Sequence, residues 1–205
     1  MTADERLAAS SRPDPPHALD GRDGRADVAF RRLAVADLPQ LHRWLNEPGV
    51  VRWWEGDDVS WEAVIRDYGP SSDPTEHWIA SVDGRDVGWI QCYAAADTAE
   101  EEETKQWWAL GVARTAAGID YLIGDPGDRG RGLGTEVIRA FVEQIAFGRH
   151  PGWTHACASP QAANEASWRA LQKAGFTFRG EFDDPLGRCR LMVADRPAAG
   201  PRSAG

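Results

Sequence analysis

Residues 118–136 read GIDYLIGDPGDRGRGLGTE, and this stretch decides the fold. Its first part, residues 118–125, is rich in apolar residues and predicts a strand. Three glycines at alternate positions follow, and from residue 132 to 147 apolar residues recur every fourth position, which predicts a helix. A strand, a bare glycine backbone and a helix N-terminus together form a general anion site, because backbone amides point outward and the helix dipole adds positive charge.

Two familiar phosphate-binding signatures fail at this loop. Gly127 and Gly132 have the spacing of the two glycines in the nucleotide signature GxxxxGK[ST]. Leu133, however, occupies the lysine position and cannot reach terminal phosphates. The dinucleotide signature GxGxxG, counted from Gly130, has Thr135 in place of its third glycine. A glycine-rich turn that only reverses the chain is the alternative for three glycines taken alone.

On either side of this stretch, strands alternate with single helices, which predicts one mixed α/β domain at residues 28–197. Asp37 is placed to cap the first helix, and an acidic run at 100–103 is expected in a loop. The flanking residues, 1–27 and 198–205, hold few large apolar residues and are expected to be disordered tails. Strands are expected at 28–33, 77–82, 87–95, 153–159, 176–183 and 188–195, and further helices at 36–46, 59–68 and 164–175.

Composition narrows the class of protein. The chain has 205 residues, 42% of them hydrophobic, and no run approaches the roughly 20 apolar residues that span a bilayer. A formal net charge of −9 disfavours binding to nucleic acid and suits a small cationic partner. Three scattered cysteines predict neither a disulfide framework nor a metal site. No secretory signal is evident, so we expect a cytoplasmic protein. We expect it to be either a monomer or a homodimer.

A third pyrophosphate signature, [Q/R]xxGx[G/A], is met in full by Arg129, Gly132 and Gly134. Further along, residues 164–176 read NEASWRALQKAGF, with an asparagine at the start and an AGF ending. On both motifs the chain resembles the GNAT N-acetyltransferases over nearly all of residues 28–195. The resemblance implies the GNAT fold, a mostly antiparallel central sheet flanked by helices, in which a splayed strand pair forms the acetyl-CoA cleft.

The resemblance also implies which residues hold acetyl-CoA. The strand near residue 120 would pair with the pantetheine arm, and the glycine loop would bind the pyrophosphate. Asn164 would contact the arm and is also placed as the N-cap of its helix, and the two roles are compatible. The residues implied are Ile119, Tyr121, Leu122, Ile123, Arg129, Gly130, Arg131, Gly132, Leu133, Gly134, Thr135, Asn164 and Ser167.

Within that superfamily the chain most resembles the aminoglycoside 6′-N-acetyltransferases, on WLNEPGVVRWWEG (44–56), VGWIQCY (87–93) and the stretch at 118–135. A polycationic sugar needs carboxylates for its ammonium groups and flat apolar faces for its rings. The alternatives are that most tryptophans serve packing and that the glutamates are solvated. The substrate contacts implied are Trp53, Trp54, Glu55, Gln91, Tyr93, Glu103, Trp107 and Asp120.

Asp120 lies between two apolar residues of its strand. Burying a carboxylate without a partner is costly, so we expect this one to have a partner or a specific role. By resemblance it anchors the acceptor ammonium and helps to remove its proton, directly or through water. The neutral amine would then attack the acetyl thioester in a ternary complex, while a backbone amide near residues 121–123 polarises the carbonyl. Neither a metal nor a covalent enzyme intermediate is needed.

One position departs from the pattern. Related aminoglycoside acetyltransferases commonly carry a tyrosine four residues before the GF glycine, as the acid for the departing thiolate, whereas this chain has Leu171. Either water protonates the thiolate, or another hydroxyl such as that of Tyr121 or Ser167 reaches the sulfur. Two further alternatives are a siderophore-biosynthesis N-acyltransferase, which typically has histidine at the position of Asp120, and a non-catalytic acyl-CoA-binding sensor. His77 and His155 lie in expected strands and are interpreted as packing or edge residues.

Overall fold

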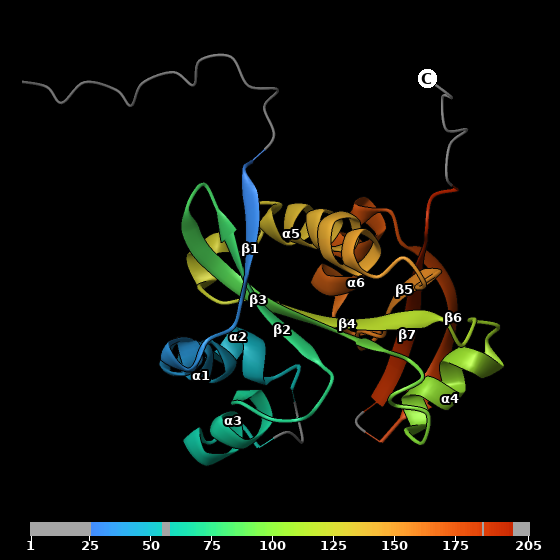
Figure 1. The fold of residues 1–205 in the computed structure, drawn as a ribbon, viewed down its shortest axis with the longest axis horizontal. Coiled ribbons are helices and arrows are strands. Elements are labelled where there is room, and N and C mark those ends of the chain that lie inside the picture. The colour runs from blue at the N-terminus through green and yellow to red at the C-terminus, as the bar shows by residue number, and fades with distance from the viewer. Residues whose placement is uncertain (1–25, 55–57, 186, 199–205) are drawn as a thin grey trace, which may run out of the picture.

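The computed structural model describes residues 26–54, 58–185 and 187–198, which form a seven-stranded sheet with helices on both faces (Figure 1). The strand order is β1-β2-β3-β4-β5-β7-β6. All neighbours are antiparallel except β4 and β5, which run parallel, so the expected mixed, mostly antiparallel sheet is confirmed. The strands are β1 Val28–Arg32, β2 Glu76–Val82, β3 Arg85–Ala94, β4 Ala116–Ile123, β5 His155–Ala158, β6 Thr177–Asp184 and β7 Gly187–Asp195.

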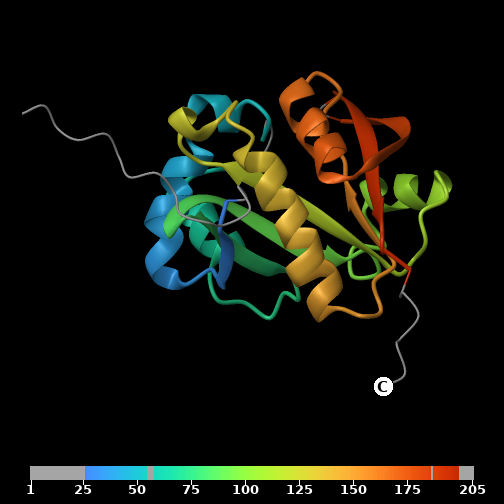
Figure 2. The same ribbon diagram turned by 90° about the horizontal axis from the view of Figure 1, so that it is seen from above.

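The helices divide between the two faces of the sheet (Figures 1 and 2). One face carries α1 Leu38–Leu45, α2 Pro48–Val51, α3 Trp61–Tyr68 and α4 Glu102–Ala109. The other carries α5 Leu133–Phe141, which continues as a π-helical turn Val142–Phe147, and α6 Glu165–Ala174. Among the described residues, no helix has the length and apolar character that crossing a bilayer requires. The expected tails, 1–27 and 198–205, lie almost wholly outside the described residues.

Each face has its own core. On the α5–α6 face, Phe141 and Leu171 are wholly buried against Trp78 and the middle of the sheet. On the opposite face, Trp44 of α1 packs on Trp89 of β3. Burying a large apolar side chain contributes roughly 1.5–3 kcal/mol, so these residues hold the helices against the sheet.

The acidic run 100–103 was expected as a loop, but only its first half lies in a turn, and its second half begins a helix. Glu102 and Glu103 occupy the first turn of α4, where carboxylates interact favourably with the helix dipole. Thr104 and Trp107, three positions apart, are both buried and hold the helix to the protein. The short helix α2 was not expected either. Its N-cap is Glu47, whose side chain accepts a hydrogen bond from the Gly49 amide.

The parallel pair β4–β5 separates in the middle of the sheet. β5 pairs with β4 only at Ala116, Ala117 and Gly118, opposite residues 155–157. Beyond Gly118, the rest of β4 pairs with β3 on one side, and no strand of the described chain pairs with its other side. The implied splayed strand pair is therefore present, and it opens at Ile119.

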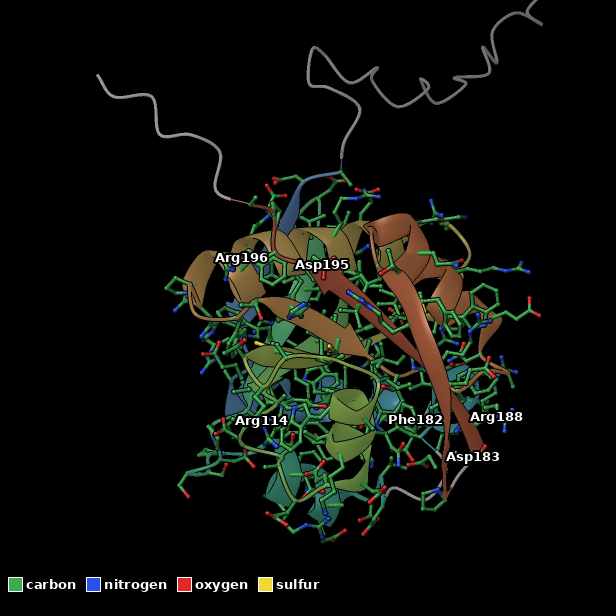
Figure 3. The ribbon with its side chains drawn as sticks, turned by 90° about the vertical axis from the view of Figure 1, so that its right-hand side faces the viewer. Arg114, Phe182, Asp183, Arg188, Asp195 and Arg196 are labelled. Atoms are coloured by element: carbon green, nitrogen blue, oxygen red, sulfur yellow. The ribbon has the colours of Figure 1, made fainter. Side chains whose placement is uncertain are left out.

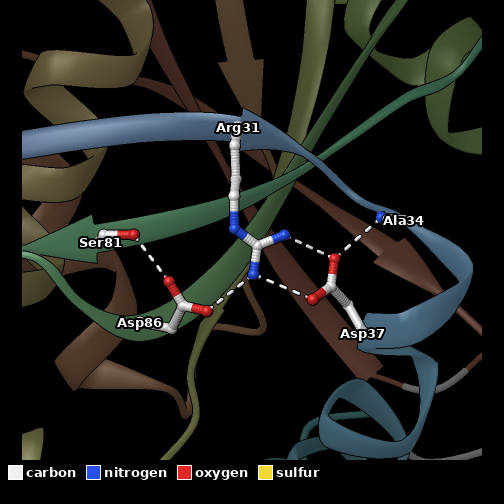
Figure 4. Close-up of polar contacts among 5 residues, drawn as sticks. All are labelled: Arg31, Ala34, Asp37, Ser81 and Asp86. Carbon is white, nitrogen blue, oxygen red and sulfur yellow. Dashed lines mark hydrogen bonds and ion pairs between the residues drawn. The ribbon is translucent and has the colours of Figure 1, made fainter.

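An ion-pair network fixes the entry into α1 (Figure 4). The Arg31 guanidinium on β1 donates to Asp37 and to Asp86, and Asp86 also accepts from the Ser81 hydroxyl. The hydrogen bond from Arg31 holds the pKa of Asp37 below its usual value. The Asp37 side chain accepts from the Ala34 amide but makes no capping hydrogen bond to α1, so its expected capping role was wrong.

The hairpin of β6 and β7 closes the other edge of the sheet (Figure 3). At one end, Arg188 donates to Asp183 across the two strands at 3.0 Å. Beyond the other end, Arg196 donates to the carbonyls of Phe147 and Trp153. The first contact joins β7 to β6, and the Arg196 contacts join the end of β7 to the segment that leads into β5.

Candidate active site

A cavity of about 600 Å³ opens where β4 and β5 separate. Its walls come from β3, β4, the N-terminus of α6, the start of α4 and the segment after α2. Because adjacent residues of a strand face opposite sides of the sheet, a cavity lined by Ile119, Asp120 and Tyr121 reaches both faces. Of the residues that the sequence indicates, those that line it are Trp53, Trp54, Gln91, Tyr93, Glu103, Ile119, Asp120, Tyr121, Asn164 and Ser167.

Asp120 lines this cavity and is half-buried. The register of β3 and β4 sets Gln91 directly opposite it, and the Gln91 side-chain amide donates to Asp120 Oδ2 at 2.8 Å. This hydrogen bond orients the carboxylate on the cavity wall. The half-buried Asp120 carboxylate therefore has a hydrogen-bond partner in Gln91, as its position between apolar residues predicts.

Glu103 is the second carboxyl group of the cavity. Burial, together with the negative charge of Asp120, raises the pKa of Glu103 to about 8, and a hydrogen bond with Ser159 partly opposes that rise. At neutral pH this carboxyl group is therefore mostly protonated, while a cation placed between Glu103 and Asp120 would favour ionisation of both.

Trp107 does not face the cavity. Its ring is 1% exposed and its indole nitrogen donates to the Ser159 hydroxyl at 2.7 Å. The implied contact of Trp107 with a substrate ring is therefore not supported by its position, and the ring instead holds Ser159 beside Glu103. The periodicity of α4, which the sequence analysis missed, is the signal that would have placed Trp107 in the core.

Aromatic rings form one wall of the cavity. Trp54 meets Trp89 edge to face with ring centroids 6.5 Å apart, and His77 stacks on Trp89 at 5.8 Å. Burial lowers the pKa of His77, so the imidazole is neutral near neutral pH. Trp53 also lines the cavity, whereas Glu55 lies outside the described residues.

Further carboxylates line the cavity: Asp67, Asp73, Glu101 and Asp184. Glu101 belongs to the acidic run at 100–103, whereas the sequence analysis did not single out the other three. They come from α3, from the segment before β2, from the N-cap of α4 and from β6. No spacing in the sequence connects them, so only the fold brings them together. The cavity is in consequence strongly acidic, in line with the net charge of −9.

Tyr93 on β3 pairs with Gly118 on β4, and the Tyr93 ring occupies the space that a side chain at position 118 would need. A Cβ atom at Gly118 would come within 2.3 Å of the Tyr93 ring, so only glycine allows the ring to lie over β4. Burial raises the pKa of Tyr93 well above its ordinary value, and the phenol stays protonated.

The glycine loop between β4 and α5 adopts the conformation that its glycines permit. Gly130 and Gly132 have φ angles of 72° and 87°, in the left-handed region, and Gly132 is the N-cap of α5. A Cβ at either glycine would meet no atom within 4 Å, so the space over these amides is open. An exposed loop at the N-terminus of a long helix suits a pyrophosphate.

Two arginines near this loop serve its structure. Arg85 makes a bidentate pair with buried Asp128, both contacts at 2.7 Å, which holds the pKa of Asp128 below its usual range. Arg129 donates to the carbonyls of Ile123 and Gly124 and pairs with Glu47. The Arg129 side chain therefore faces the protein rather than the open side of the loop.

The other implied loop and strand residues divide by exposure. Arg131 is exposed at the open side, whereas Thr135 is buried and Leu133 packs beside Ile123 on the apolar core. Leu122 is buried against the α1 face, so only its backbone can meet a ligand. The loop residues do not line the cavity, but they follow directly on β4, whose free edge runs from the cavity toward them.

The N-terminus of α6 contributes two polar residues, Asn164 and Ser167, to the cavity wall. Asn164 caps the helix by accepting from the Ser167 amide at 3.2 Å. The Ser167 hydroxyl lies 2.7 Å from the Tyr121 hydroxyl, which comes from β4 on the other side of the gap. Leu171, one turn further on, is 0% exposed and belongs to the core.

A group of possible metal ligands lies outside the cavity. Glu76, Cys92 and His150 offer ligand atoms within 4.8 Å of one another. Glu76 already pairs with Arg32 at 2.8 Å, and burial raises the pKa of the Cys92 thiol to about 12. An arginine cation beside a protonated thiol disfavours a metal ion at this position.

Comparison with known proteins gives a consistent result. Residues 34–184 match the family model described as an acetyltransferase (GNAT) domain. The aminoglycoside N(6')-acetyltransferase type 1 of Klebsiella pneumoniae is 31% identical over 83% of this chain and 84% of its own. The solved structure of AAC(6')-Ib in complex with parmomycin and acetyl-CoA superimposes with a TM-score of 0.72, covering 82% of this chain and 93% of that one at 31% identity. A lysine N-acyltransferase of Mycolicibacterium paratuberculosis is 26% identical over 94% of this chain and 82% of its own.

Proposed function

Since the chain belongs to the GNAT acetyltransferase family, we propose that it transfers the acetyl group of acetyl-CoA to an amine of an aminoglycoside. One observation carries the proposal: Asp120, oriented by Gln91, lies in an acidic, aromatic-walled cavity where the sheet opens. Of the relatives named above, the Klebsiella pneumoniae protein is an aminoglycoside N(6')-acetyltransferase, and the solved AAC(6')-Ib structure holds parmomycin and acetyl-CoA. By similarity the acceptor is the 6′ amine.

The residues present fit acetyl-CoA. Left-handed Gly130 and Gly132 leave open space over the amides at the N-terminus of α5, which suits the pyrophosphate. The free edge of β4 offers backbone groups to the amides of the pantetheine arm, and Asn164 and Ser167 face the same cavity. Acetyl-CoA supplies an activated acetyl thioester at the end of that arm.

The cavity also fits a polycationic sugar. Its carboxylates, including Asp73 and Asp184, attract ammonium groups, and the rings of Trp53 and Trp54 offer flat faces to the sugar. An ammonium group held between Asp120 and Glu103 would draw the proton from Glu103, because the positive charge stabilises both carboxylates. At a pH below the pKa of Glu103 in the unliganded protein, binding of the aminoglycoside is therefore expected to release the Glu103 proton.

Asp120 then acts as the general base. Its carboxylate takes a proton from the bound ammonium, directly or through water, and the neutral amine attacks the thioester carbonyl. A backbone amide of the free β4 edge at residues 121–123 donates to the carbonyl oxygen as charge develops there. The bound pair is held in line, so the reaction needs no covalent enzyme intermediate.

The enzyme is further proposed to work in the cytoplasm, where acetyl-CoA is made, as a monomer or a homodimer. The test is to incubate the full chain with acetyl-CoA and kanamycin or ribostamycin, and to follow thiol release and the mass of the product. Asp120→Asn is expected to lower kcat by about 10²–10⁴ while CoA binding is retained. Asp97→Asn, at an exposed position, is the matched control.

The alternatives give different outcomes in the same assay. Turnover of lysine or its N6-hydroxy derivative, with none of any aminoglycoside, would replace the proposal with siderophore-type acylation. CoA binding without transfer to any amine of a broad panel would indicate a sensor. Acetylation of an aminoglycoside that Asp120→Asn abolishes would support the proposed function.

A further inference from the structure

The hydroxyl groups of Tyr121 and Ser167 bridge the gap between β4 and α6. Their oxygens lie 2.7 Å apart, and the Tyr121 hydroxyl donates a hydrogen bond to the Ser167 carbonyl oxygen at 3.2 Å. Both residues line the cavity, although 46 positions separate them in the chain. The proposed function so far uses neither hydroxyl group.

Tyr121 and Asp120 face opposite sides of the sheet. Ile119 and Tyr121 pack against the core formed with α5 and α6. Asp120 faces Gln91, whose neighbours on the same side of β3, Trp89 and Tyr93, belong to the cores on the other face. One cavity thus presents a carboxylate on one face of the sheet and a phenol on the other.

The cofactor loop belongs to the face of Tyr121. α5 begins at Leu133, directly after the left-handed glycines, and a Cβ at Gly134 would lie 3.7 Å from the Ile123 side chain. Ile123 shares its side of β4 with Ile119 and Tyr121. A ligand held by this loop therefore reaches the gap from the α5–α6 face, whereas the acidic pocket approaches it from the other.

This division settles which group meets which end of the reacting bond. Sulfur is the last atom of the pantetheine arm, so it stays on the side from which the arm arrives. The amine comes from the side of Asp120. We propose that the Tyr121 hydroxyl, aligned by Ser167, donates the hydrogen bond that stabilises the departing thiolate. This inference rests on the proposed function.

The step balances in atoms and charge. The amine nitrogen forms its bond to the acetyl carbon, and the electron pair of the broken carbon–sulfur bond goes to sulfur. Asp120 passes to water the proton that it took from the ammonium, and then takes the second proton, which the nitrogen loses after it attacks. The Ser167 hydroxyl donates to the Tyr121 oxygen, and the Tyr121 hydroxyl turns its proton from the Ser167 carbonyl to the thiolate. The thiolate takes its own proton from solvent after release. Burial raises the pKa of Tyr121, so the phenol stays protonated and keeps donating.

Ser159 also lines the cavity, but its hydroxyl is engaged with the Trp107 indole nitrogen and with Glu103. Leu171 is wholly buried and carries no polar atom. Tyr93 lines the same cavity but lies on the face of Asp120. Tyr121 is therefore the catalytic donor in this assignment, and Ser167 is a positioning residue.

Equilibrium binding tests the assignment without turnover. The probes are CoA and desulfo-CoA, in which hydrogen replaces the thiol, titrated by calorimetry from neutral to alkaline pH. The wild type is expected to prefer CoA increasingly as the bound thiol ionises. Tyr121→Phe should reduce that preference roughly 10- to 100-fold, the usual effect of losing a hydrogen bond to a charged group. Its retained affinity for desulfo-CoA shows that the variant is folded.

Further variants separate alignment from packing. Ser167→Ala should lose part of the preference for ionised CoA, and Ser167→Thr should restore it, because threonine keeps the hydroxyl group. Tyr93→Phe removes a phenol from the other face and should leave the ratio of the two affinities unchanged. In turnover, Tyr121→Phe should lower kcat with little change in KM for acetyl-CoA.

Two results would overturn the assignment in distinguishable ways. If Tyr121→Phe and the wild type discriminate equally between CoA and desulfo-CoA at every pH, Tyr121 does not donate to the sulfur, and the proposed function stands. If the wild type binds neither probe, the proposed function fails and this assignment fails with it.

Discussion

Replacing Glu103 by glutamine is expected to stabilise the protein at alkaline pH and to leave its stability unchanged in acid. Burial and the charge of Asp120 raise the pKa of Glu103 from 4.5 to about 8, so the folded state holds a proton that the unfolded state has lost. The favourable contribution of the protonated carboxyl is complete below pH 4.5 and is lost as the pH rises to about 8. Glutamine stays neutral throughout.

The pKa interval sets the size of this effect. From 4.5 to about 8, at about 1.36 kcal/mol per pH unit, Glu103→Gln should gain at most about 5 kcal/mol of unfolding free energy above pH 8. At pH 7 the gain should be about 3 kcal/mol, because part of the interval is not yet crossed.

The assay is urea unfolding of the two proteins at a series of pH values. Glu100→Gln, at a fully exposed side chain next to α4, is the matched control and should follow the wild type. If the unfolding free energies of the wild type and of Glu103→Gln changed in parallel between pH 4.5 and about 8, the reasoning would be refuted. The Glu103 carboxyl would then ionise as freely in the folded state as in the unfolded state.

Three further changes test the loop and the core. Gly132→Ala should cost about 1–2 kcal/mol and weaken CoA binding, because alanine is strained at a φ of 87°, while Gly127→Ala in the same loop should not; calorimetry and unfolding measure both. Asp128→Asn should weaken CoA binding, and adding Arg85→Gln should weaken it no further, because both belong to one pair; additive losses in this double-mutant cycle would contradict it. Leu171→Ala should lower the unfolding free energy by about 2–5 kcal/mol, as a cavity replaces a wholly buried side chain, and a loss well under that range would argue against its core position.

α4 shows where interpretation of the sequence was limited. A run of acidic residues reads as a solvated loop, but carboxylates in a first turn also stabilise a helix, and the burial of Thr104 and Trp107 decides between the two. The same helix brings Glu103 to the cavity and takes Trp107 away from it. One missed element therefore explains both the implied contact that the structure supports and the one that it does not.

Arg129 shows a similar limit at the cofactor loop. The signature [Q/R]xxGx[G/A] includes this arginine, and the resemblance implied a contact with pyrophosphate. In the fold its guanidinium donates to the carbonyls of Ile123 and Gly124 and pairs with Glu47. A motif gives residue types and spacing, but the direction of a long side chain depends on the acceptors that other segments provide.

By itself, the sequence determined the order of the strands and of helices α1, α3, α5 and α6, and it marked the glycine loop proposed for pyrophosphate, because periodicity and glycine spacing are local properties of the chain. It did not determine the acidic cavity, the raised pKa of Glu103 or the pairing of Tyr121 with Ser167. These features join residues from separate elements, such as β4 and α6, whose distances are set by topology and whose charges are set by burial. Only packing around the gap between β4 and β5 decides them, because desolvation and hydrogen-bond geometry exist only once the sheet and its helices are assembled.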